Sequence, residues 1–310
     1  MMAAMSQTLS LHALNRVLAS IDAPRNGRAL YALLAAFCLA GLMLASAESA
    51  LAKANTTVGV IWALGGLAAA FIGVNATGLM LMDQARGREV REVVDAFHDA
   101  LRSAPKVLLT LLLVLSSLGL AAAAVIGLLY SARLPGVGPA LFALLVPFSV
   151  TALGVMAFSG LVLIGPLTGP SIWAGKSPAQ TARMLARQLR HGPLEAAALM
   201  MAVFLMTGLV SAAVSFVVIS GGRALALLMV WLIGIDVPAQ QLIAGLFGYG
   251  LRSLGASGAP VATSSLAVAA QTGGGVVFAV ALVLPTLVYL RGCCAVYLAL
   301  QDAPSDDAAL

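Results

Sequence analysis

Six apolar runs, each long enough to cross a lipid bilayer as a helix, constrain this chain more than any other feature of its sequence. A hydrocarbon core about 30 Å thick needs roughly 20 apolar residues in helical conformation. Only 9% of the residues are charged and the mean hydropathy is +1.01, values that exclude an ordinary soluble domain. The sequence therefore predicts an all-α integral membrane protein. Its six transmembrane helices cover approximately residues 28–47, 57–82, 105–130, 138–165, 193–220 and 266–299.

The basic residues divide unequally between the two sides that six alternating spans define. Four lie on one side, Lys53, Arg133, Arg223 and Arg252. The other thirteen lie with both termini on the opposite side: Arg16, Arg25, Arg28, Arg86, Arg88, Arg91, Arg102, Lys106, Lys176, Arg183, Arg187, Arg190 and Arg291. Because loops rich in Lys and Arg stay in the cytoplasm, we predict that both termini are cytoplasmic. Basic residues scattered over short loops also argue against a nucleic-acid partner, although the pI is about 9.4.

A short amphipathic segment and a proline precede each odd-numbered span. In residues 88–103 the apolar side chains follow the spacing of one helix face: Val90, Val93, Val94, Phe97 and Leu101. Residues 177–191 and the N-terminal segment, with Leu11, Leu14, Val17, Leu18 and Ile21, repeat the pattern more weakly. The three segments end at Pro24, Pro105 and Pro193. Proline restricts the residue before it and is tolerated in the first turn of the next helix, so we predict an interfacial helix before each hairpin of spans.

This pattern predicts one polytopic membrane domain built from three parallel repeats. The repeats cover approximately residues 6–82, 88–165 and 177–300, and the third carries an insertion on the outer side at approximately residues 221–265. We expect this insertion to form two short helices, either on the membrane surface or as a re-entrant hairpin. Arg25 and Arg28 before the first run, with an Ala-Ser-Ala sequence after it, also allow a cleaved signal peptide, but the length of the run favours a retained helix.

The middles of the six spans contain no Asp, Glu, Lys, Arg or His. Ionisable residues at that depth usually mark proton transfer, ion transport or catalysis in a membrane, so their absence argues against those activities. Cys38, Cys293 and Cys294 lie in apolar runs without a metal-binding spacing. His12, His98 and His191 are distributed one to each interfacial segment. We expect no catalytic, cofactor or metal site.

The most polar residues at depth are Asn75 and Thr77, which form a candidate mid-membrane polar site. Small residues at helical spacing, including Gly65 and Gly73 in the second span and Gly119, Ala123 and Gly127 in the third, predict close helix packing. We expect Pro147, Pro166 and Pro285 to kink or end their helices. The candidate contacts for lipid headgroups are Arg102, Lys106, Arg187 and Arg190.

The segments VVDAFHDALRSAPKVLLTLLLVL and SPAQTARMLARQLRHGPLEAAALMMAVFL resemble the repeated signature of the membrane domain of glycerophosphodiester phosphodiesterases and of related uncharacterised bacterial inner-membrane proteins. The resemblance covers roughly residues 10 to 300. It implies a multi-pass protein of the bacterial inner membrane. The phosphodiesterase activity of that family belongs to a separate soluble barrel, so the resemblance assigns no functional residue here.

These patterns lead us to expect a non-enzymatic polytopic membrane protein, either a scaffold or accessory subunit or a lipid-interacting module. Its expected partners are membrane lipids, with a protein partner or a second copy as further candidates. A transporter or channel for a small neutral or apolar solute, using Asn75 and the outer insertion, is the alternative. A membrane-embedded enzyme would need Asp83, His98, Asp99 and His191 to converge near the cytoplasmic surface.

Overall fold

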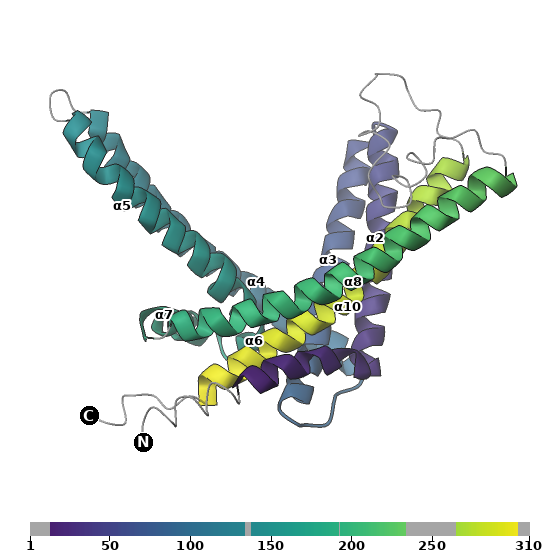
Figure 1. Ribbon diagram of the computed structural model, residues 1–310, viewed down its shortest axis with the longest axis horizontal. Helices are drawn as coiled ribbons and strands as arrows, with labels where there is room; N and C mark the ends of the chain where they lie inside the picture. Colours follow the sequence, from purple (N-terminus) through teal and green to yellow (C-terminus); the bar gives the residue numbers. More distant parts are fainter. Residues whose placement is uncertain (1–12, 134–137, 192, 234–264, 303–310) are drawn as a thin grey trace. The chain divides into compact units, whose positions relative to one another are not determined.

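The computed structural model of the 310-residue chain describes residues 13–133, 138–191, 193–233 and 265–302 (Figure 1). Every regular element within these ranges is a helix. Six helical stretches are long and apolar enough to cross a membrane: Gly27–Leu51, Thr56–Ala85, Val93–Arg133, Gly138–Trp173, Pro193–Leu225 and Val276–Asp302. The prediction of an all-helical chain with six candidate spans is confirmed.

The elements follow one another along the chain with short connections. Residues 13–18 are α-helical. The labelled elements are η1 (Ala19–Arg25), α2 (Gly27–Ala52), α3 (Thr56–Ala85), α4 (Val93–Tyr130), η2 (Ser131–Arg133), α5 (Gly138–Phe158), η3 (Ser159–Ile164), α6 (Gly165–Trp173), α7 (Pro178–His191), α8 (Pro193–Ile233) and α10 (Ser265–Asp302). The chain divides into two compact units, one formed by Met1–Ala19, Leu101–Val203 and Gly292–Leu310 and the other by Ser20–Ala100 and Phe204–Arg291.

Helices α2 and α3 form a closely packed hairpin in the second of these units. A Cβ atom added at Gly66 would lie 3.1 Å from the carbonyl oxygen of Ala40, and one added at Gly59 would lie 3.3 Å from that of Ala47. A Cβ atom at Gly73 would collide with the Cβ of Ala36. The close face of α3 therefore runs through glycines spaced by seven residues. It shares Gly73 with the small-residue face expected from the sequence, whereas Gly65 meets only the flexible end of Met43.

The amphipathic segment before the third span differs from the prediction. We expected a separate interfacial helix over residues 88–103 that ends at Pro105, but α4 begins at Val93 and continues through Pro105 to Tyr130. Proline removes one backbone hydrogen bond. The residue before it is Ala104, a strong helix former that is buried at 6% exposure. Burial of Ala104 and its high helix propensity explain why the helix survives the missing bond.

The other two predicted entry prolines lie at true helix boundaries. Pro24 is inside the last turn of the 3-10 helix η1, and α2 starts three residues later under the Asn26 cap, whose Oδ1 accepts from the backbone N–H of Ala29 at 3.1 Å. Pro193 is the first residue of α8. A helix separate from the following span therefore occurs in the third predicted repeat, as α7, and not in the second.

The helix expected to begin the outer insertion is corrected, and the three prolines expected to kink or end their helices lie within continuous helical stretches. Residues 221–233, expected to form a short outer helix, continue α8, and residues 234–264 lie outside the described residues. Pro147 and Pro285 lie inside α5 and α10, and Pro166 follows a π-helical segment, η3, in which Gly165 donates to the carbonyl oxygen of Gly160. A π-bulge is a common local solution for a helix that must accommodate an irregularity such as a proline.

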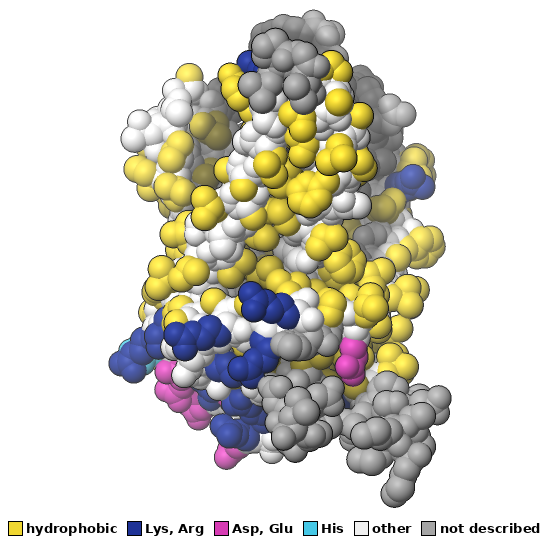
Figure 2. Space-filling view, turned by 90° about the vertical axis from the view of Figure 1, so that its left-hand side faces the viewer, with side chains coloured by type: hydrophobic (Ala, Val, Ile, Leu, Met, Phe, Trp, Pro, Cys, Tyr) yellow, Lys and Arg dark blue, Asp and Glu magenta, His cyan; other side chains and the backbone are white. Residues whose placement is uncertain are grey.

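Most of the side chains on the surfaces of the spans are apolar. Figure 2 shows hydrophobic side chains over most of the face that it draws. Large examples that are more than half exposed include Leu120, Leu144, Leu161 and Phe216. In water such surfaces would be a liability, whereas in a bilayer they contact acyl chains. The exposure pattern agrees with the membrane assignment.

Candidate functional site

The connection between α3 and α4 holds the densest group of charged residues in the described chain. α3 ends at Ala85, and Gly87 has a φ of +66°. The N–H of Gly87 donates to the carbonyl oxygen of Gln84 at 3.2 Å and the N–H of Arg88 to that of Asp83 at 3.0 Å. This pair of bonds is the Schellman motif, which favours glycine at its left-handed position. The motif reverses the chain, so that residues after Gly87 return toward Asp83.

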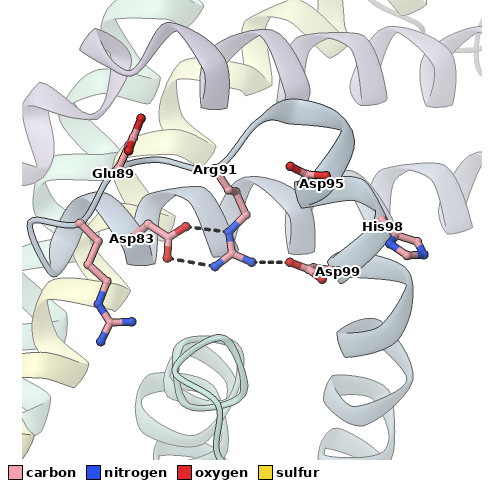
Figure 3. A pocket seen from close by; sticks show the side chains of 7 residues that line it. Asp83, Glu89, Arg91, Asp95, His98 and Asp99 are labelled. Atoms are coloured by element: carbon pink, nitrogen blue, oxygen red, sulfur yellow. Dashed lines mark hydrogen bonds and ion pairs between the residues drawn. The ribbon is translucent and has the colours of Figure 1, made fainter.

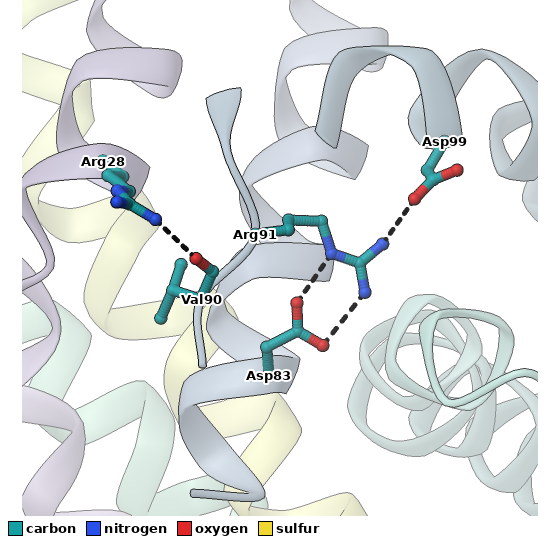
Figure 4. Close-up of polar contacts among 5 residues, drawn as sticks. All are labelled: Arg28, Asp83, Val90, Arg91 and Asp99. Atoms are coloured by element: carbon teal, nitrogen blue, oxygen red, sulfur yellow. Dashed lines mark hydrogen bonds and ion pairs between the residues drawn. The ribbon is translucent and has the colours of Figure 1, made fainter. Parts of the chain in front are cut away.

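Arg91 is the centre of this connection (Figure 4). Its Nε and Nη2 bind the two carboxylate oxygens of Asp83 at 2.6 and 2.9 Å, and its Nη1 binds Oδ2 of Asp99 at 2.8 Å. Asp83 belongs to the last turn of α3 and Asp99 to the second turn of α4. One guanidinium therefore ties the end of one helix to the beginning of the next, with bidentate geometry toward Asp83.

The electrostatics of this contact favour a permanently charged Arg91. The hydrogen bonds that Arg91 donates to Asp83 raise the pKa of Arg91 above its ordinary value, and the charge of Asp99 acts in the same direction against the effect of burial. The side chain of Asp83 is 12% exposed and that of Arg91 is 26% exposed. Asp83 lies near the negative end of the α3 dipole, where a carboxylate is disfavoured. The ion pair with Arg91 offsets this cost.

The start of α2 is tied to the same connection. Arg28 donates from Nη1 to the backbone carbonyl of Val90 at 2.7 Å (Figure 4). Asn26 donates from Nδ2 to Oε1 of Gln84 at 3.2 Å. Side-chain to backbone bonds of this kind satisfy carbonyl groups that no helix would satisfy. The first three spans of the chain are therefore linked at one end by a set of specific polar contacts, all within the unit that contains residues 20–100.

A cavity of about 480 Å³ opens beside Arg91 (Figure 3). It is lined by Asp83, Arg88, Glu89, Arg91, Asp95, His98 and Asp99. The structure thus brings together three of the four residues that a membrane-embedded enzyme would need, Asp83, His98 and Asp99; the side chain of His191 is not described. Two of the three are carboxylates already bound to Arg91. The described residues contain no group of three or more His, Cys, Asp or Glu able to hold a metal ion.

The candidate mid-membrane polar residues are both buried. Asn75 is 1% exposed and donates from Nδ2 to the carbonyl oxygen of Phe71 at 2.8 Å, within its own helix. Thr77 is fully buried, and its Oγ1 has no hydrogen-bond partner among the described residues. Neither the charged cavity nor a second, apolar cavity of about 610 Å³ between α4 and the α5–η3 segment is lined by these two residues.

The four candidate headgroup contacts are all exposed and lie on two helices. Arg102 and Lys106 are on α4, and Arg187 and Arg190 are on α7. Sequence reasoning missed Arg183, which precedes Arg187 by four residues on α7. It also missed the role of Arg91, which lies eight residues from both of its partners. The signals available were the helical spacing of residues 183, 187 and 190, and a glycine placed between Asp83 and Arg91.

Comparisons with known proteins find no matching family model, no similar curated protein and no similar solved structure. The resemblance to the membrane domain of glycerophosphodiester phosphodiesterases therefore stays an expectation from the sequence.

Proposed function

We propose that this chain is a non-enzymatic, multi-pass protein of the bacterial inner membrane that acts as a lipid-interacting module or as a scaffold for other membrane components. One observation carries the proposal. On the continuous helix α4, the basic residues Arg102 and Lys106 share a face with the exposed residues Leu109, Leu113 and Leu120. These positions are separated by 4, 7, 11 and 18 residues from Arg102, the spacing of one helix face.

This arrangement is the one expected at the boundary between acyl chains and headgroups. The exposed leucines would contact acyl chains, and the basic residues one to two turns before them lie where phosphate groups are found. The opposite face of α4 is buried and small or β-branched, with Ala104, Val107 and Val114. Helix α4 therefore presents lipid-contacting residues on one face and packing residues on the other.

Three further observations support the proposed topology and organisation. Arg16 and Asp302 form an ion pair with an Nη1–Oδ2 distance of 2.6 Å, as expected for two termini on the same side of the membrane. The Schellman motif at Gly87 recurs at Gly175, 88 residues later, and the prolines 105 and 193 are also 88 residues apart. We propose that these features are traces of the parallel repeats, with the basic ends of the spans in the cytoplasm.

The experiment that tests the proposed function is native mass spectrometry of the protein extracted gently from its own membrane, with both lipids and proteins identified. A stoichiometric protein partner would support the scaffold form of the proposal, and retained phospholipid the lipid-interacting form. A purified protein that is monomeric and free of both would contradict it.

A transporter or channel for a small neutral or apolar solute is the second candidate function, favoured by the buried hydroxyl of Thr77, which has no partner in the described part of the chain. Its test is accessibility labelling of single cysteines at positions 75, 77 and 166 in a variant that lacks Cys38, Cys293 and Cys294. Labelling from either side of the membrane would support transport. If all three positions resist labelling from both sides, transport through this region is ruled out.

A further inference from the structure

We propose that α7 is a docking surface for anionic phospholipids of the membrane leaflet that it faces, and that Arg183, Arg187 and Arg190 bind their phosphate groups. This inference rests on the proposed function and names the site and the lipid class. The three arginines are exposed. Arg187 and Arg190 follow Arg183 by 4 and 7 residues, so the three form one stripe along the helix.

The stability of α7 does not depend on the three arginines. Its N-terminus is closed by a reciprocal pair of bonds: the backbone N–H of Gln180 donates to Oγ of Ser177 at 3.3 Å, and the backbone N–H of Ser177 donates to Oε1 of Gln180 at 3.0 Å. This is a capping box, with Pro178 at the first helical position. On the side opposite the arginines, Thr181 and Leu185 are buried, and Oγ of Ser171 lies 3.1 Å from Oγ1 of Thr181. One face of α7 therefore packs against protein while the arginine face is left outside.

No negative charge of the protein balances this stripe within the described residues. The segment from Pro178 to His191 contains no Asp or Glu, and no ion pair of the described chain involves Arg183, Arg187 or Arg190. By contrast, three of the four charged residues from Glu92 to Arg102, in the corresponding segment of the second predicted repeat, are acidic, and one of them, Asp99, is bound to Arg91. The α7 stripe is complementary to an external anion, which a phosphate supplies.

The chain holds α7 at the depth of the headgroups. Only residues 174–177 separate it from the fourth span, and only Gly192 separates it from the fifth. Four extended residues reach at most about 14 Å, so α7 cannot move far from the membrane surface. A soluble acidic protein would have to compete with headgroups that are already adjacent, which is why we assign the surface to lipid.

The apolar surface of α8 points to the same occupant. Leu194 and Met201 of α8 are exposed and follow Arg190 by 4 and 11 residues along the chain. Apolar side chains therefore follow the basic ones in the sequence, as they do on α4. Arginine binds phosphate with two parallel N–H donors, so the stripe favours a lipid with an exposed phosphate and net negative charge over a zwitterionic one.

The test compares lipid preference in the full-length protein reconstituted in nanodiscs that contain phosphatidylglycerol and phosphatidylcholine in equal amounts. Bound lipids are counted by native mass spectrometry after partial delipidation. The wild-type protein should retain phosphatidylglycerol preferentially, and the variant R183Q/R187Q/R190Q should lose at least about tenfold in that preference. Salt at about 0.5 M should weaken the preference of the wild-type protein, because it screens exposed charges.

Two matched variants make the result specific. K53Q/R133Q/R223Q removes three exposed positive charges from the other predicted side and should keep the preference, which excludes an effect of net charge. R183K/R187K/R190K retains the charge and should keep most of the preference for phosphatidylglycerol. An unchanged preference in R183Q/R187Q/R190Q, in protein that is monodisperse and as helical as wild type, would overturn the proposal. So would an equal loss in K53Q/R133Q/R223Q, or a protein partner that R183Q/R187Q/R190Q loses while its lipid preference is retained.

The outcome is separable from that of the proposed function. A protein that retains phospholipid without any preference for the anionic class keeps the proposed function and overturns only the assignment of α7. A monomer that retains neither lipid nor protein overturns both.

Discussion

The α3–α4 connection and the α6–α7 connection begin in the same way and end differently. After α3, Gly87 has a φ of +66° and Arg88 donates to the carbonyl of Asp83; after α6, Gly175 has a φ of +94° and Lys176 donates to the carbonyl of Ser171 at 3.2 Å. The glycines are 88 residues apart. The same backbone turn therefore leads from a span into an amphipathic segment in both places.

The charges that follow the two turns are different. Asp95, Asp99 and Arg102 of α4 correspond, 88 residues later, to Arg183, Arg187 and Arg190 of α7. Asp99 forms an ion pair with Arg91, whereas Arg187, at the corresponding position, has an exposed guanidinium. The position that corresponds to Arg91 is occupied by Ala179. One connection uses its charges to fix its own helices, and the other presents them to the surroundings. A shared backbone motif thus does not imply a shared role.

Arg91 and Lys176, one cation close to each turn, show the same contrast. Arg91 is held by two carboxylates, whereas the ammonium of Lys176 lies 5.4 Å from the centre of the Tyr297 ring and 3.2 Å from the sulfur of Met184. Burial lowers the pKa of Lys176, while the bond with Asp83 raises the pKa of Arg91. A cation over an aromatic ring is stabilised less than one paired with carboxylates in the same protein.

The largest expected effect comes from removing the ion pairs that Arg91 forms with Asp83 and Asp99. Arg91→Met leaves Asp83, whose side chain is 12% exposed, without its counter-charge, so we expect the free energy of unfolding to fall by about 2 kcal/mol. Denaturant titration of the micellar protein, followed by circular dichroism, measures this change. The matched variant Arg183→Met on α7 should cost less than about 0.5 kcal/mol. Equal losses in the two variants would remove the distinction between the connections.

The shared turn predicts equal effects at its two glycines. An added Cβ would meet no atom within 4 Å at Gly87 or at Gly175, so the cost of alanine is the strain of a positive φ alone. We expect Gly87→Ala and Gly175→Ala each to destabilise the protein by about 1 kcal/mol. The same titration tests the pair. A cost at only one glycine would show that the two turns are not equivalent.

The capping box gives a smaller and local effect in α7. Ser177→Ala removes the acceptor for the N–H of Gln180 and should cost about 0.5–1 kcal/mol. Hydrogen exchange should become faster in residues 178–184 and unchanged in α4. Ser116→Ala, which removes an exposed side-chain bond to the carbonyl of Leu113 within α4, serves as the control. Faster exchange throughout the protein would mean that the substitution destabilises the whole protein and not α7 alone.

The smallest effect is the pH dependence that Lys176 contributes. Its pKa in the folded protein is lowered by burial, so between that pKa and 10.5 the unfolded chain carries a proton that the folded protein does not. Stability therefore rises with pH through this interval. The variant Lys176→Met should flatten the rise, as measured by thermal unfolding between pH 8 and 10.5. A stability that falls over this range in the wild-type protein and not in the variant contradicts the assigned direction.

Much of the fold could be predicted from the sequence, but the candidate site could not. Predicted span starts at residues 28, 57 and 193 lie within one residue of Gly27, Thr56 and Pro193. The Arg91 network was missed because its partners are eight residues away in each direction, and side chains with that spacing on one helix lie about 12 Å apart along the axis. The pairing with Asp83 requires the reversal at Gly87. The continuation of α4 through Pro105 was also missed, because it depends on the burial of Ala104.

The sequence by itself determined that this is a six-span helical membrane chain, because the preference of about twenty apolar residues for a bilayer is a property of each run alone. It also determined where positive charge gathers. Only the tertiary structure decided which charges neutralise one another and which stay exposed. Asp83 and Arg91 meet through a backbone turn, while Arg183, Arg187 and Arg190 face away from the buried side of α7. Charge pairing depends on distances of a few ångströms in space, and those distances are set by packing.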